Sequence, residues 1–183
     1  MNYATIKTHD IANGPGVRVT LFVSGCTNHC EQCFQPQTWD FCFGRPFDAE
    51  AEAILDEELD KSYVRGLTLL GGEPMEPANQ RVLCPLLKRL KQRHPDKDIW
   101  CFSGFRLEDE LLNPDAYPHC EVTEELLSYV DVLVDGRFVL AQKDIGLRFR
   151  GSRNQRLIDL RKTRSEGHIV LWDDGTGKKG ARD

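Results

Sequence analysis

Short apolar runs alternate with longer amphipathic stretches along this chain. The apolar runs predict β-strands, and the amphipathic stretches predict α-helices. The predicted strands cover residues 17–23, 66–70, 99–103 and 130–134, with short further candidates at 157–160 and 168–172. The predicted helices cover residues 49–60, 77 to about 93, and 123–129. Asp48 and Thr123 are the predicted caps of the first and third helices, and Pro85 is expected to kink the second helix or to delay its start.

The four main strand candidates contain few polar residues, and helices separate most of them. Strands that are apolar on both faces are typical of parallel sheets that are covered by helices and joined by right-handed connections. The expected fold class is therefore α/β. Sites in such sheets form at the carboxyl ends of the strands, so we expect a site in the loops after Val23, Leu70, Ser103 and Val134.

Composition and charge narrow the possible roles. The chain has 183 residues, of which 40% are hydrophobic and 29% are charged, as expected for a single folded domain. A net charge of -5, from 24 Lys and Arg against 29 Asp and Glu, disfavours a nucleic-acid partner. No apolar stretch approaches the roughly 18 residues that cross a bilayer, and the N-terminus lacks the layout of a signal peptide. We therefore expect a cytoplasmic protein that does not associate with membranes.

Two features near the C-terminus suggest functions that we weigh against simpler explanations. Residues from about 173 to 183 are expected to form a flexible tail, and residues 175–180 within it match the dinucleotide pattern G-x-G-x-x-G. Only three residues follow, too few for the helix that would receive a phosphate, so no dinucleotide site is predicted. The basic stretch 148–164 is either a solvated face or a docking surface for a partner.

Seven cysteines require an explanation. An odd number without an export signal argues against a disulfide framework, so the thiols are expected to be free or to bind metal. Cys26, Cys30 and Cys33 form a C-x3-C-x2-C pattern in the loop after a predicted strand, where three thiolates can converge on one metal centre. A three-cysteine iron–sulfur cubane leaves one iron open to a substrate or cofactor. The alternative is a zinc ion with Cys42 or His29 as fourth ligand.

The other cysteines and the loop after the second predicted strand say less about the function. Cys84, Cys101 and Cys120 lie in or beside predicted helices and strands, where a lone cysteine usually packs as a small hydrophobic residue. The loop at residues 71–74 has the sequence GGEP and directly follows a predicted strand. Adjacent glycines allow a sharp turn and a close approach to a ligand, and carbonyls with a carboxylate suit an ammonium group. A glycine pair after a strand is also an ordinary tight turn.

Together these segments resemble the radical S-adenosylmethionine (SAM) enzymes and, within them, the activating enzymes of anaerobic, glycyl-radical ribonucleotide reductases. The resemblance spans most of the chain. It is carried by HDIANGPGVR (9–18), FVSGCTNHCEQC (22–33), GGEP (71–74), WCFSGFRLE (100–108), VDVLVDGRF (130–138) and RGSRNQR (150–156). The resemblance implies a partial (β/α)6-type barrel of parallel strands with helices outside.

The resemblance also implies roles for individual residues. The three cysteines Cys26, Cys30 and Cys33 would bind a [4Fe-4S] cluster, with SAM chelating its fourth iron. The GGEP loop, which comprises Gly71, Gly72, Glu73 and Pro74, would receive the methionine ammonium through its first three residues. Neighbours of the adenosine would be Phe34, Ser103 and Gly104, and further polar contacts would come from Asp135 and Arg137. Gln32 stands where many members of the superfamily have an aromatic residue.

The implied activity is reductive cleavage of SAM, which generates a glycyl radical on the catalytic subunit of an anaerobic ribonucleotide reductase. The implied electron donor is flavodoxin or a similar carrier. Two other functions stay open from the sequence. One is a different small radical SAM enzyme, which would activate another glycyl-radical enzyme or modify a small molecule. The other is a zinc-binding interaction module without catalysis.

Overall fold

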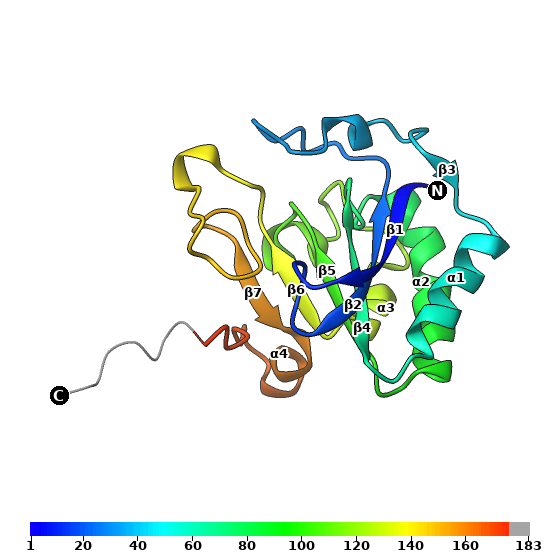
Figure 1. Ribbon diagram of the computed structural model, residues 1–183. Coiled ribbons are helices and arrows are strands. Elements are labelled where there is room, and N and C mark those ends of the chain that lie inside the picture. Colours follow the sequence, from blue (N-terminus) through cyan, green and yellow to red (C-terminus); the bar gives the residue numbers. More distant parts are fainter. Residues whose placement is uncertain (176–183) are drawn as a thin grey trace.

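One mixed sheet of seven strands organises the chain, in the order β3-β1-β2-β4-β5-β6-β7 (Figure 1). The computed structural model describes residues 1–175, so residues 176–183 of the expected tail, with all of the glycine pattern except Gly175, lie outside the described residues. The strands are β1 (Asn2–Asp10), β2 (Val17–Val23), β3 (Arg45–Pro46), β4 (Val64–Gly71), β5 (Asp98–Phe102), β6 (Val132–Asp135) and β7 (Arg156–Asp159). The four central strands β2, β4, β5 and β6 are parallel, which confirms the predicted α/β class.

Antiparallel strands flank this parallel centre, and the sequence indicated β7 among them but neither β1 nor β3. Strand β1 pairs with β2 and β3, while β7 pairs with β6, and all three pairings are antiparallel. The candidate strand at 157–160 corresponds to β7, except that Leu160 already begins a helix. The candidate strand at 168–172 is wrong, because this stretch makes only an isolated bridge between Leu171 and Ile158.

Four α-helices connect or cover the strands: α1 (Ala49–Leu59), α2 (Pro77–Arg93), α3 (Thr123–Tyr129) and α4 (Leu160–Glu166). Asp48 caps α1 as predicted, since its side chain accepts hydrogen bonds from the backbone of Glu50 and Ala51. The predicted cap at Thr123 is wrong. Val122 occupies the cap position, and the Thr123 hydroxyl donates to Gln80 Oε1 at 2.7 Å instead.

Helix α2 begins at Pro77 and continues through Pro85, so Pro85 does not delay its start. A proline inside a helix costs a backbone hydrogen bond, about 3 kcal/mol. The apolar face of α2 offsets this cost, because Leu83, Leu87 and Leu90 are all buried in the main core. That core fills the space between the sheet and the helices α1, α2 and α3, which lie to the right of and behind the sheet in Figure 1.

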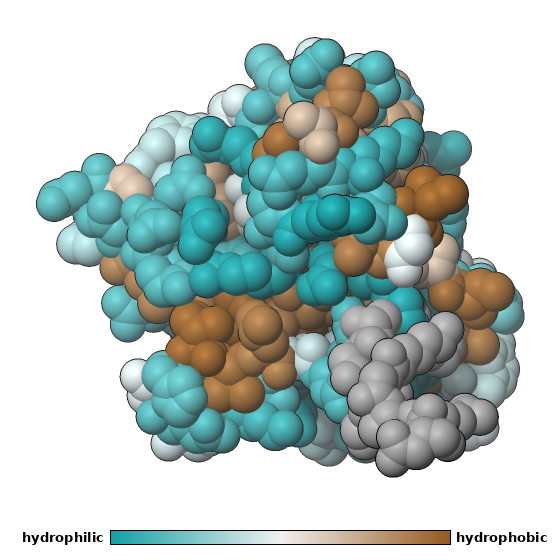
Figure 2. All heavy atoms as spheres, turned by 90° about the vertical axis from the view of Figure 1, so that its left-hand side faces the viewer, coloured by the Kyte–Doolittle hydropathy of each residue, from teal (hydrophilic) through white to brown (hydrophobic). Residues whose placement is uncertain are grey.

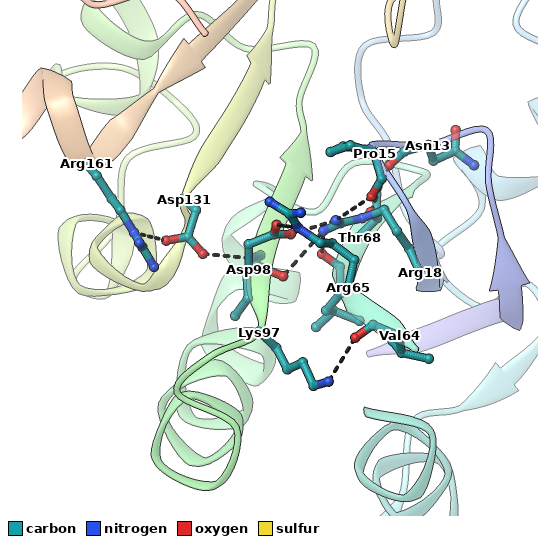
Figure 3. Close-up of polar contacts among 12 residues, drawn as sticks. Asn13, Pro15, Arg18, Val64, Arg65, Thr68, Lys97, Asp98, Asp131 and Arg161 are labelled. Atoms are coloured by element: carbon teal, nitrogen blue, oxygen red, sulfur yellow. Dashed lines mark hydrogen bonds and ion pairs between the residues drawn. The ribbon is translucent and has the colours of Figure 1, made fainter. Parts of the chain in front are cut away.

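The opposite face of the sheet carries a second apolar cluster and a buried charge. Trp100, Val132, Val134 and Leu157 form this cluster, against which Phe102, Phe149 and Trp172 pack. Beside it, Arg18 of β2 is 0% exposed and forms an ion pair with Asp98 at 2.6 Å. Figure 3 shows that Arg18 points across the sheet toward Asp98 of β5, near Thr68 of β4.

The basic stretch at 148–164 is held by partners within the chain. Arg150 pairs with Asp174, Arg153 pairs with Asp144, and Arg156 pairs with Asp135 and Glu108. Two further arginines donate hydrogen bonds to backbone carbonyls: Arg148 donates to Asp174, and Arg164 donates to Leu127. These arginines therefore link the segment after β6 to the rest of the fold. Within residues 1–175, no helix combines the length and the apolar composition that a bilayer crossing requires.

Candidate functional site

The loops after the four parallel strands meet at one cavity of about 640 Å³. Because parallel strands end at the same edge of a sheet, side chains that are far apart in sequence come together there. From the predicted site residues, the cavity is lined by Cys26, Cys30, Cys33, Phe34, Gly71, Gly72, Glu73, Ser103 and Gly104. The four loops in which we expect a site therefore come together in space, since each of them contributes to the wall of this one cavity.

All three cysteines of the triplet are free thiols on this wall. Cys26 is buried directly after β2, whereas Cys30 and Cys33 are half-buried. The loop curls because His29 and Gln32, which flank Cys30, both adopt left-handed backbone conformations, with φ of 44° and 55°. The chain between β2 and β3, which contains this loop, extends along the top of Figure 1.

Burial favours the neutral form of two of these thiols, those of Cys26 and Cys30. It raises the pKa of Cys26 to about 11, which the negative charge of Glu73 reinforces and the backbone N–H groups of Asn28 and His29 partly oppose. Burial also raises the pKa of Cys30, against the backbone N–H of Phe138. A metal that binds these sulfurs must therefore displace protons.

The zinc alternative needs a fourth ligand, and the structure places neither candidate on the cavity wall. Cys42 is exposed, and the His29 ring stacks on Trp39 with the ring centres 4.5 Å apart. Among the residues that the structure describes, no group of three or more His, Cys, Asp or Glu side chains, the cysteine triplet included, is drawn together as around a metal ion.

The segment that follows the cysteines returns to support them. The backbone N–H of Gly25 donates to Thr38 at 2.8 Å, and that of Cys26 donates to Trp39 at 3.2 Å. Gly25 has a φ of 94°, and a Cβ there would lie 2.3 Å from the Phe41 ring, so glycine is required at this position. A Cβ at Gly72 would lie 2.6 Å from the Gly25 carbonyl oxygen, which shows how closely the GGEP loop approaches the cysteine loop.

Glu73 is the buried charged group of the site. Its Oε1 accepts from the backbone of Met75 at 2.9 Å, and its Oε2 accepts from Gly104 at 2.6 Å and from Asn28 Nδ2 at 2.9 Å. Burial raises the pKa of Glu73 to about 7, although these hydrogen bonds favour the charged form. Through these bonds the Glu73 carboxylate links the loops after β2, β4 and β5.

Three of the predicted site residues do not line the cavity. Pro74 follows Glu73 away from the wall. Asp135 is buried, where it accepts from the backbone of Leu107 at 2.9 Å and pairs with Arg156. Arg137 donates from Nε to Asn28 Oδ1 at 2.5 Å, and it reaches the cavity through this residue of the wall.

Sequence reasoning missed other parts of the wall. Ala12 and Asn13 line it from the β1–β2 connection, and Trp39 lines it below the cysteine loop. The connection between β6 and β7 adds residues between 143 and 155, among them Ile145, which is 96% exposed. This connection lies at the upper left of Figure 1, and the face on that side shows hydrophobic groups exposed between hydrophilic residues (Figure 2). The one indication of these wall residues in the sequence was that residues 9–18 and 150–156 are among the segments that carry the family resemblance, although no role was assigned to them.

The remaining cysteines lie away from this cavity. Cys84 and Cys101 belong to the buried main core, as predicted. Cys120 is only half-buried, and its sulfur lies 3.5 Å from the Thr123 hydroxyl.

Comparisons with known proteins agree with this geometry. A family described as a 4Fe-4S single cluster domain matches residues 12–158. The protein named anaerobic ribonucleoside-triphosphate reductase-activating protein from Pasteurella multocida is 43% identical over 157 residues, which are 85% of this chain and 95% of that protein. Proteins of the same name from Enterobacteria phage T4 and Escherichia coli are 40% and 37% identical, over 86% and 88% of this chain and 93% and 100% of their own lengths.

Proposed function

Because the chain belongs to the family of anaerobic ribonucleoside-triphosphate reductase-activating proteins, we propose that it cleaves SAM at a [4Fe-4S] cluster and generates a glycyl radical on such a reductase. The observation that carries the proposal is that three free cysteines share one cavity wall with the GGEP loop. Three thiolates suit a cubane cluster with one open iron, and the cavity of about 640 Å³ leaves room beside them for a further ligand.

In this proposal Cys26, Cys30 and Cys33 hold the cluster. Once loaded, the cluster would pass one electron from the external donor to SAM, and SAM would supply the radical chemistry that removes a hydrogen atom from a glycine of the partner. The protein binds, orients and excludes water. The backbone of Gly71 and Gly72 can approach the methionine part closely because neither residue has a side chain.

Other residues serve this cavity in different ways. Phe34, Ser103 and Gly104 lie on the wall where the adenosine part would bind. Glu73 supports the site through its three donors, and these hydrogen bonds favour its charged form, which would attract a ligand that carries a sulfonium and an ammonium. Arg137 acts from behind the wall through Asn28, whereas Asp135 pairs with Arg156, which does not line the cavity.

The partners follow from the same proposal. The protein substrate is the catalytic subunit of an anaerobic ribonucleotide reductase, and the electron donor is flavodoxin or a similar carrier. The parallel strands β2, β4, β5 and β6 would form part of a (β/α)6-type barrel whose mouth is the cavity. The exposed side chains of Phe34 and Ile145, at 81% and 96%, leave this mouth accessible to a segment of another protein.

The test uses the full chain, reconstituted anaerobically with iron and sulfide. We expect a protein that cleaves SAM under dithionite and produces a glycyl radical signal in electron paramagnetic resonance (EPR) when an anaerobic ribonucleotide reductase is added. The matched variants are Cys30→Ala, which should lose both reactions, and Cys84→Ala, which should keep both. SAM cleavage without a glycyl radical on the reductase would show that the substrate is another molecule, and a protein without a cluster would contradict the proposal.

A further inference from the structure

The side chain of Asn28 lies between loops that come from different strands. Asn28 stands in the cysteine loop, midway between Cys26 and Cys30. Its amide nitrogen Nδ2 donates to Glu73 Oε2 at 2.9 Å, and its amide oxygen Oδ1 accepts from Arg137 Nε at 2.5 Å. One amide thus connects the loop after β2 with the loops after β4 and β6.

The loop after β5 closes on the same group. The backbone N–H of Gly104 donates to Glu73 Oε2 at 2.6 Å, next to the Asn28 bond. A Cβ at Gly104 would lie only 2.5 Å from Asn28 Nδ2, so this glycine makes room for the amide. All four loops of the cavity therefore meet at the Asn28 side chain.

The chemistry of an amide suits this position. Glu73 offers an acceptor and Arg137 offers a donor, and asparagine is a neutral side chain that can satisfy both at once. Arg137 also donates to Glu110 Oε1 at 3.1 Å, so its guanidinium is fixed on the far side as well. An aspartate at position 28 would keep the acceptor for Arg137 but would lose the donor toward Glu73.

The course of the cysteine loop itself depends on other contacts. Glu76 is fully buried, and its Oε1 accepts from both the backbone N–H and the hydroxyl of Thr27, at 2.7 and 2.6 Å. Gly25 and Cys26 donate to the backbone of the segment that follows. The Asn28 amide is therefore not needed to hold the backbone at Cys26, and its bonds are directed at the neighbouring loops instead.

We propose that Asn28 is a positioning residue for SAM, which holds Glu73 and Arg137 in register with the cluster loop. The inference rests on the proposed function. Loss of the amide would separate two properties of the site: the cluster would still form on the three cysteines, while the loops that face SAM would lose their common link. SAM affinity should then fall without a matching loss of iron.

The experiment compares wild type, Asn28→Ala, Asn28→Asp and the control Glu31→Gln. Glu31 is an exposed residue of the same loop that does not line the cavity, so Glu31→Gln leaves the bonds of Asn28 in place. Each reconstituted protein is assayed for iron content, for SAM affinity by calorimetry, and for the change that SAM causes in the EPR spectrum of the reduced cluster. We expect full iron content in all four. SAM affinity should fall about tenfold in both Asn28 variants, which corresponds to ~1.4 kcal/mol, and the EPR change should be altered in them alone.

A double-mutant cycle with Arg137→Gln tests the link itself. If Asn28 acts by holding Arg137, the double variant Asn28→Ala/Arg137→Gln should bind SAM about as weakly as whichever single variant binds it more weakly. If the two losses of SAM affinity add up in the double variant, the inference is overturned. Wild-type affinity in Asn28→Ala and Asn28→Asp would overturn it too, as would a loss of iron in both. If wild type itself binds neither cluster nor SAM, the proposed function fails, which is a distinct outcome.

Discussion

Replacement of Arg18 by methionine should destabilise the protein far more than the same change at Arg65, although both arginines pair with Asp98. Arg18 is 0% exposed and lies 2.6 Å from Asp98 Oδ1, whereas the Arg65 side chain is 63% exposed and lies 3.0 Å from Asp98 Oδ2. Figure 3 shows the two side chains approaching Asp98. The two arginines thus form one buried and one exposed ion pair with the same carboxylate.

The magnitude follows from what Arg18 binds. Besides the ion pair, its Nε donates to Thr68 Oγ1 at 2.7 Å and its Nη2 donates to the Leu67 carbonyl at 2.8 Å. With methionine at position 18, these buried acceptors would lose their donor, which costs about 1–3 kcal/mol of stability for each acceptor. Apolar contacts of the methionine side chain would offset part of this cost. Removal of one partner from a buried pair typically costs about 3–5 kcal/mol, and an exposed pair contributes about 0–1 kcal/mol. We expect ~3 kcal/mol or more for Arg18→Met and at most ~1 kcal/mol for Arg65→Met.

The assay is urea unfolding of the apoprotein under reducing conditions, followed by tryptophan fluorescence. Trp100 is a local reporter, because the Arg18 guanidinium lies 5.6 Å from the centre of its ring. The slope of free energy against urea should stay the same in all three proteins, so that the midpoints report stability. Equal losses in the two variants, or a loss below ~1 kcal/mol for Arg18→Met, would refute the reasoning from burial.

Three further predictions concern single side chains. Cys84→Ala should keep its iron and lose roughly 1 kcal/mol or somewhat more of stability from a small cavity; loss of iron would show that the metal ligands are misassigned. Asp48→Ala should cost about 1 kcal/mol in urea unfolding, because two backbone donors of α1 lose their acceptor; an unchanged midpoint would show that the cap contributes nothing. The pKa of Glu73 is raised from 4.5 to about 7, so between these values the folded protein holds a proton that the unfolded chain releases. The contribution of this proton to the free energy of unfolding is fully present below pH 4.5 and is lost as the pH rises through 7. Relative to Glu73→Gln, wild-type apoprotein should therefore lose up to ~3 kcal/mol between pH 4.5 and 7.5, and a constant difference would contradict this.

The centre of the fold could be predicted because its strands and helices have strong local patterns. Strand β2 was predicted with its observed bounds, and α1 was predicted from its cap. Strand β1 was missed because its polar residues do not form the apolar run of a buried strand. The bounds predicted for α2 match the structure, but the delayed start considered because of Pro85 does not occur, since the sequence does not show how much apolar surface the fold buries on either side of this proline.

The site was predictable where the chemistry sits in consecutive residues, and not where folding assembles it. The cysteine triplet and the GGEP loop stand out by residue type and spacing. Asn28 carries no such signal, because its role depends on Glu73 and Arg137, which lie 45 and 109 positions away in the sequence. Trp39 and Ile145 likewise reach the cavity only through the connections after β2 and β6.

The claim that three cysteines hold a cubane with one open iron is tested most directly by Mössbauer spectroscopy. The protein is reconstituted with iron-57 under anaerobic conditions and measured before and after addition of SAM. One iron of the cluster, about a quarter of the total signal, should shift on SAM addition while the others stay unchanged. A mononuclear ion, or a cluster whose four irons all remain unaffected by SAM, would contradict the claim.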